Sequence, residues 1–181
     1  MLWSLLSEQI VTSEKQIVEI QLNRNLRSEI KVAVKCHFDL PVVVDVPKNL
    51  DDGTPFPTMY WLTCPMYIKK VSTLESHGMV KELDNQLNRN RKLRKLWSKR
   101  QKSYEKERNR KYKNVNNKVS PIWGVGGAVN SIKCLHSHLA DELVTGKNIV
   151  GQIVLENVGG CNCNEPCVLQ GTKNDNWRSE W

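Results

Sequence analysis

Cys134 and His138 are the pair of residues whose types and spacing point most directly to metal chemistry. They lie four residues apart in the block GVGGAVNSIKCLHSH, within a stretch that predicts a helix over 132–145. Residues at this spacing share one face of a helix, so we expect the thiol and the imidazole to supply two ligands of a tetrahedral site. His136 would point to the opposite, apolar face, where we expect a core histidine.

Two further cysteines each follow a predicted strand. Cys36 follows the strand predicted over 30–35, and Cys64 follows the strand predicted over 59–63. Sheet geometry would let both thiols face the Cys134 helix. A site with three cysteines and one histidine would suit zinc.

In an alternative arrangement, cysteines of the C-terminal tail complete the set of metal ligands. Cys161, Cys163 and Cys167 follow one another there and would fold back to complete a thiolate cluster, the ligand set that iron–sulfur clusters prefer. We favour zinc slightly over an iron–sulfur cluster. The predicted metal ligands are Cys36, Cys64, Cys134, His138 and Cys167.

Thiol chemistry without a metal is the alternative enzyme hypothesis. Pro65 suits the first position of a helix, which places Cys64 at a helix N-terminus, where amide groups and the helix dipole favour a thiolate. Cys64 or Cys134 would then be a nucleophile activated by His138. An open metal site would equally make an enzyme, with Asp52, Thr54 and Asp141 as candidate polar helpers. In the inert alternative, the cysteines are small buried hydrophobes.

Positive charge is concentrated in one segment. Thirteen Lys and Arg against two Glu between 89 and 113 give a local charge of +11, and since the whole chain carries +8, the remainder carries −3. Trp97, Tyr104 and Tyr112 are interleaved with these charges, a mixture suited to the phosphates and stacked bases of RNA, or to polyphosphate. This predicts an RNA- or polyphosphate-binding module even without a metal, although a solvated helix with no partner explains the charge at least as well. The basic residues we predict to contact the anion are Arg91, Lys92, Arg94 and Lys95.

A glycine-rich stretch is a second candidate anion site. Gly126 and Gly127 precede the helix predicted over 132–145, and Lys133 lies in its first turn, so backbone amides would face a phosphate. The stretch lacks the Gly-Lys-Ser/Thr ending of a nucleotide-binding loop, and tight packing explains it about as well.

The helices and strands expected to position these residues indicate an α+β fold. Ser13 and Gln16 form a capping box for a first helix, and β-branched runs predict a small, mostly antiparallel sheet. Helices are expected from 65 to about 78, over 80–113, over 132–145 and over 149–158. We predict one domain over 1–181, with a long basic helical arm at 80–118 and a cysteine-containing tail at 159–181 that either folds back to the site or is flexible.

Composition narrows the class of protein. A chain of 181 residues suits one domain with a sizeable core. It has no apolar run near the roughly 20 residues of a membrane helix, and its start lacks the pattern of a secretory signal, so we expect a cytoplasmic protein. In that reducing compartment the six cysteines would be free thiols or ligands and not disulfides.

The blocks DGTPFPTMYWLTCP and GVGGAVNSIKCLHSHLADELVTGKNIVG resemble the bacterial domain-of-unknown-function family five hundred and one. The resemblance runs from about Val32 to Val154, and members of the family carry a glycine where this chain has Asp39. The family has no assigned activity. Its genes often lie beside those for exopolyphosphatase and a septum-formation initiator, which implies a bacterial cytosolic protein but no particular reaction.

Overall fold

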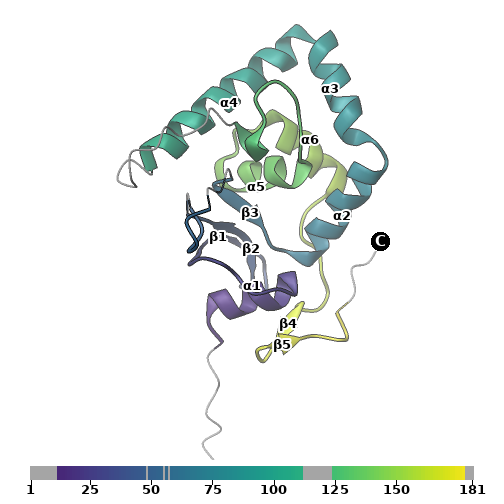
Figure 1. The fold of residues 1–181 in the computed structure, drawn as a ribbon. Helices are drawn as coiled ribbons and strands as arrows, with labels where there is room; N and C mark the ends of the chain where they lie inside the picture. The colour runs from purple at the N-terminus through teal and green to yellow at the C-terminus, as the bar shows by residue number, and fades with distance from the viewer. Residues whose placement is uncertain (1–11, 48, 55, 57, 112–123, 178–181) are drawn as a thin grey trace, which may run out of the picture.

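The structure, a computed structural model, describes residues 12–177 except 48, 55, 57 and 112–123. It is an α+β fold in which helices pack around a three-stranded antiparallel sheet (Figure 1). The helices are α1 (Glu14–Leu22), α2 (Pro65–Ser76), α3 (Met79–Arg89), α4 (Arg91–Lys111), the short 3-10 helix η1 (Val125–Gly127), α5 (Leu135–Thr145) and α6 (Ile149–Val158). The strands are β1 (Lys31–Lys35), β2 (Pro41–Asp45), β3 (Tyr60–Leu62) and the hairpin β4 (Val168–Leu169) and β5 (Thr172–Lys173).

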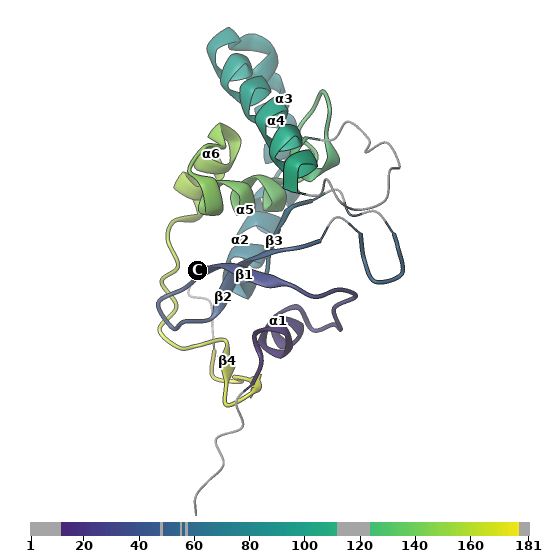
Figure 2. The same ribbon diagram turned by 90° about the vertical axis from the view of Figure 1, so that its left-hand side faces the viewer.

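The sheet has the order β1-β2-β3 and is covered on both faces. On one face, Val44 packs with Val18 of α1, and on the other, Val43 packs with Leu62 and Leu139 of α5. Figure 2 shows α1 on one side of the sheet and α5 with α6 on the other. Because β2 is central, its β-branched run is buried on both faces, as expected of a strand between two helical layers.

Several helix boundaries confirm the sequence-based predictions. Ser13 caps α1 through a complete capping box with Gln16, and Pro65 begins α2 with Cys64 as the N-cap residue. The last helix runs from Ile149 to Val158 as expected.

The prediction of a single helix over 80–113 is wrong, because the helix is interrupted at Asn90. This residue has extended backbone angles, and its side chain accepts a hydrogen bond from the Leu93 amide at 3.0 Å. Asparagine favours such a capping geometry over continuing a helix. The basic segment is therefore two helices, α3 and α4, which meet at an angle (Figure 1).

A buried polar network joins α4 to α5 and α6. Arg100 donates from Nε and NH2 to Asp141 at 2.7 and 2.6 Å, and Asn148 donates to Asp141 at 2.8 Å. The Asn148 side-chain oxygen accepts from the Gly151 amide and also lies 3.0 Å from His138 Nδ1, so that nitrogen carries a hydrogen. Every side chain of the network is at least nine-tenths buried. Asp141 therefore holds helices together.

The C-terminal tail folds back over the sheet. The β4–β5 hairpin contacts α1, and Gln21 of α1 donates to Cys167 Sγ at 3.5 Å. No helix among the described residues is both long and apolar enough to cross a membrane.

Candidate functional site

Three thiols from distant segments meet where the tail passes the sheet. Cys36 follows β1, Cys64 precedes α2, and Cys161 lies shortly after α6. The thiol of Cys161 lies close to the thiols of Cys36 and Cys64, and both affect its pKa. Cys64 is buried in the main hydrophobic core, and the half-buried Cys36 and Cys161 pack against it. We call this group, with Cys163, the thiolate cluster.

The turn after Cys36 is built to point amide groups at its sulfur. The amides of Phe38 and Leu40 both donate to the Cys36 thiol, while the Asp39 amide donates to the Cys36 carbonyl at 2.9 Å. Asp39 adopts a left-handed backbone conformation with φ of 59°. Glycine occupies this region without strain and aspartate tolerates it, so the turn is compatible with either residue.

Cys163 is held beside this turn by its backbone. The ring of His37 lies 3.0 Å, by its Nε2, from the Cys163 carbonyl oxygen, so this nitrogen carries the hydrogen. Cys163 also acts electrostatically on Cys161 and on Cys167. It is therefore the next thiol available to the cluster, two residues after Cys161.

Three cysteines of this region, Cys36, Cys161 and Cys167, have raised pKa values. The hydrogen bond with Cys161, together with burial, raises the pKa of Cys36. For Cys161, the contact with Cys36 favours the thiolate, but Cys64 and burial outweigh it and raise the pKa to about 12. Burial also raises the pKa of Cys167.

Cys134 lies outside α5, which corrects the helix predicted to start at 132. It is the N-cap residue of α5, with extended backbone angles, and the first helical residue is Leu135. The helical spacing from Cys134 to His138 therefore does not apply. His138 is fully buried, and burial lowers its pKa, so it is a neutral member of the polar network.

His136, expected in the core, instead partners Cys134. Its Nδ1 lies 3.9 Å from Cys134 Sγ and 3.2 Å from Glu75 Oε1, at the end of α2. Its Nε2 lies 3.3 Å from the Ile68 carbonyl and 3.3 Å from Ser72 Oγ. No spacing in the sequence connects Glu75 with Cys134, so only the folded chain reveals this group.

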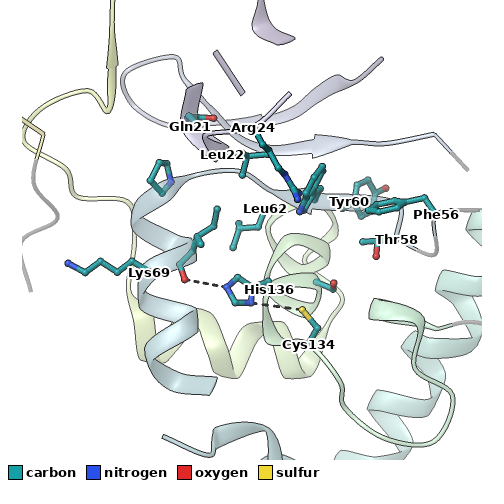
Figure 3. A pocket seen from close by; sticks show the side chains of 14 residues that line it. Gln21, Leu22, Arg24, Phe56, Thr58, Tyr60, Leu62, Lys69, Cys134 and His136 are labelled. Carbon is teal, nitrogen blue, oxygen red and sulfur yellow. Dashed lines mark hydrogen bonds between the residues drawn. The ribbon is translucent and has the colours of Figure 1, made fainter. Parts of the chain in front are cut away.

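Cys134 and His136 line a cavity of about 540 Å³ between the sheet, α2 and the start of α5. Figure 3 shows these two side chains on one side of the cavity and Arg24, Tyr60 and Phe56 on the opposite side. Burial disfavours the Cys134 thiolate, but hydrogen bonds from His136 and Ser137 outweigh it and lower the pKa of the thiol. Burial likewise opposes the charge on His136, but Cys134 and Glu75 raise its pKa.

The predicted polar helpers lie apart from these thiols. Asp52 accepts from the Thr54 amide at 2.9 Å and pairs with Arg27, so both residues organise an exposed turn. Asp141 belongs to the buried polar network described above.

The glycine-rich stretch packs against the start of α5. A Cβ on Gly126 would lie 3.5 Å from Cys134 Cβ, and the Gly127 amide donates to the Gly124 carbonyl at 3.0 Å. Since α5 begins only at Leu135, these glycines do not form its N-terminus. The geometry favours packing over a phosphate loop, and Lys133 is an exposed residue beside it.

The start of the basic segment exposes its charges, whereas the described aromatic residues of the segment are buried. Arg91, Lys92, Arg94 and Lys95 are exposed at the start of α4. Trp97 and Tyr104 are buried, with 4% and 1% of their surfaces exposed, so neither can stack on a base. The remaining aromatic residue of that prediction, Tyr112, lies outside the described residues.

The comparisons with known proteins identify a family but no activity. No curated protein and no solved structure matches the chain. One family model, described as "Protein of unknown function (DUF501)", matches residues 32–156, which include Cys36, Cys64, Cys134 and His136 but not the tail cysteines. Because this match spans well over half of the 181 residues, the chain belongs to the family of proteins of unknown function DUF501.

Proposed function

We propose that this protein binds a metal ion through the thiolate cluster of Cys36, Cys64, Cys161 and Cys163, with zinc as the favoured ion. The observation that carries the proposal is the meeting of Cys161 with thiols from two other segments. Burial and a neighbouring thiol raise the pKa values of Cys36 and Cys161, whereas a bound cation would stabilise the thiolate forms and join the three segments. All six cysteines are free, which suits the reducing, cytoplasmic location that we include in this proposal.

With all four sulfurs bound to one ion, the cluster would be a closed, structural site. Four sulfur ligands fill the tetrahedral coordination of zinc and leave no position for a substrate. Amides of Phe38 and Leu40 donate to the Cys36 sulfur and would orient it toward the ion. Bound metal would then anchor the tail to the sheet, a contribution to folding stability.

Metal analysis of protein purified without oxygen tests this proposal. We expect C64S and C161S each to lose one equivalent of zinc relative to the wild type, while H77Q, which replaces an exposed histidine outside the cluster, keeps the wild-type content. Broad absorbance near about 400 nm would show an iron–sulfur cluster in the same ligands instead of zinc. Metal content unchanged in C64S and C161S would refute the cluster.

We also propose an anionic partner for the start of α4. Four exposed cations lie there, and the first turn of the helix contains no acidic residue. The positive end of the helix dipole adds to this charge, so a bound phosphate chain would relieve repulsion. With Trp97 and Tyr104 buried, recognition would rest on phosphates of RNA or polyphosphate and not on stacked bases.

Retention on immobilised RNA and polyphosphate at low salt tests this second proposal. Replacing Arg91, Lys92, Arg94 and Lys95 with Glu should abolish retention. Replacing them with Gln should lower the slope of log affinity against log salt by roughly 3 for a single strand. The exposed-lysine control K173E, on the hairpin, should bind as the wild type does. A wild type that is not retained rules the proposal out.

A further inference from the structure

Three metal-ligand atoms converge at the edge of the cavity, separately from the thiolate cluster. Glu75 lies in the last turn of α2, Cys134 immediately precedes α5, and His136 lies in the first turn of α5. A carboxylate oxygen, the thiol sulfur and one imidazole nitrogen of these residues all lie within 4.8 Å of one another. None of the three donors is fully buried, so the group is accessible to an ion.

We propose that Glu75, Cys134 and His136 form a second metal site, which binds a zinc-class divalent cation and keeps a coordination position open to the cavity. Zinc–ligand bond lengths at tetrahedral angles place nitrogen and sulfur about 3.6 Å apart, and nitrogen and oxygen roughly 3.3 Å apart. The observed separations are 3.9 Å and 3.2 Å. The ion therefore fits with small side-chain shifts.

The geometry of His136 distinguishes a metal site from a catalytic relay. In a nucleophile–histidine–carboxylate relay, the nucleophile and the carboxylate contact opposite nitrogens of the ring. Here Cys134 and Glu75 both contact Nδ1, while Nε2 faces the Ile68 carbonyl. A carbonyl that holds one N–H and leaves the other nitrogen free for an ion is the usual support of a metal-bound histidine.

Glu75 is held in place independently of any ion. Its Oε1 accepts a hydrogen bond from the Leu135 amide at 2.6 Å, which fixes the carboxylate at the start of α5. The first-turn amide and the carboxylate thus tie α2 to α5 at the point where the ligands meet. Pre-positioned donors of this kind lower the cost of ordering a site when the ion binds.

The cavity beside the site indicates which class of ligand the open coordination position would accept. Three protein ligands with a fourth position for water or substrate are typical of catalytic zinc sites. The cavity volume of about 540 Å³ lies in the range of small-molecule pockets. Arg24 lines the same cavity with its guanidinium 4.1 Å from the Trp61 ring centre, so we assign the open position to water or a small anion.

Zinc titration of the full chain, stripped of metal under reducing conditions, tests the site. We expect two equivalents in the wild type and one in each of C134S, H136Q and E75Q. The E75Q variant keeps an oxygen for the Leu135 amide but is a poor ligand, so its loss of zinc would not reflect a lost helix contact. The control H77Q replaces an exposed histidine at the end of α2 and should keep both equivalents. Circular dichroism checks the fold of each variant.

Cobalt substitution separates this site from the thiolate cluster. C161S should retain the cavity ion, with a sulfur-to-cobalt band about one quarter as intense as that of a four-thiolate site, and sodium azide should shift its visible spectrum. A C161S protein that binds no cobalt, or the same zinc content in the wild type and folded C134S, would overturn the cavity site. An azide-insensitive spectrum would overturn its open position. Loss of zinc in C161S but not in C134S would bear on the thiolate cluster and not on the cavity site. The experiment can therefore refute either proposal without refuting the other.

Discussion

Breaking the buried pair of Arg100 and Asp141 should be a strongly destabilising single change, because it leaves one charge buried without its partner. Two hydrogen bonds of 2.7 and 2.6 Å join them, and their side chains are 3% and 1% exposed. Burial opposes the charge of Arg100, but Asp141 and Glu107 more than offset this and raise the pKa of the guanidinium. The stability of the pair therefore depends on both partners being charged.

Replacing Asp141 with Asn removes the charge while keeping the shape. One of the two acceptor oxygens becomes an amide donor that faces the guanidinium, and Arg100 is left with Glu107 as its anionic partner. Breaking a buried pair in this way costs about 3–5 kcal/mol. For a chain of this size the melting temperature should fall by roughly 6–20 °C.

Urea unfolding at neutral pH measures this cost, and a surface pair supplies the control. Lys15 and Glu29 are also 2.6 Å apart, but Glu29 is 85% exposed, so E29Q should cost far less than D141N. The double variant R100M/D141L should recover much of the loss, because an apolar pair leaves no buried charge. A D141N cost no larger than that of E29Q would refute the reasoning.

Three further predictions follow from other buried groups. Burial lowers the pKa of His138, so below about pH 6.5 the unfolded chain binds a proton that the folded chain does not bind. The free energy of unfolding should therefore decrease by up to about 1.4 kcal/mol for each unit by which the pH is lowered. An NMR titration of the His138 ring with a midpoint at or above pH 6.5 would contradict this. The pKa of Cys161 is raised to about 12, so zinc must displace thiol protons when it binds. Chelator competition should therefore show a zinc affinity that rises about tenfold per pH unit for each proton released. A zinc affinity that does not change with pH would contradict this prediction. In G151A the new Cβ would lie 2.2 Å from the His138 carbonyl oxygen, so the free energy of unfolding should decrease by about 1–3 kcal/mol or more. In the control G160A the new Cβ meets no atom within 4 Å, so the change should be nearly neutral. Equal effects of the two substitutions would refute the packing argument.

Local residue chemistry was enough to predict most elements of the fold. The capping box at Ser13, the proline after Cys64 and the β-branched run of β2 each act within a few residues, so their structural meaning is visible in the sequence. The break at Asn90 was missed because basic helix formers continue on both sides of it, and the capping contact of the Asn90 side chain decides the geometry.

The candidate site was predicted less well, for a physical reason. The positions of Cys36 after β1 and of Cys64 before α2 were predictable, because strand and helix boundaries depend on local residue chemistry. The sequence assigned the wrong histidine to Cys134, since a shift of three residues in the start of α5 removes Cys134 from the helical spacing. The meeting of Cys161 with Cys36 and Cys64, and of Glu75 with His136, depends on segments up to 125 residues apart. Only the tertiary structure decided those contacts, because the packing of the tail and of α2 against α5 brings the side chains together.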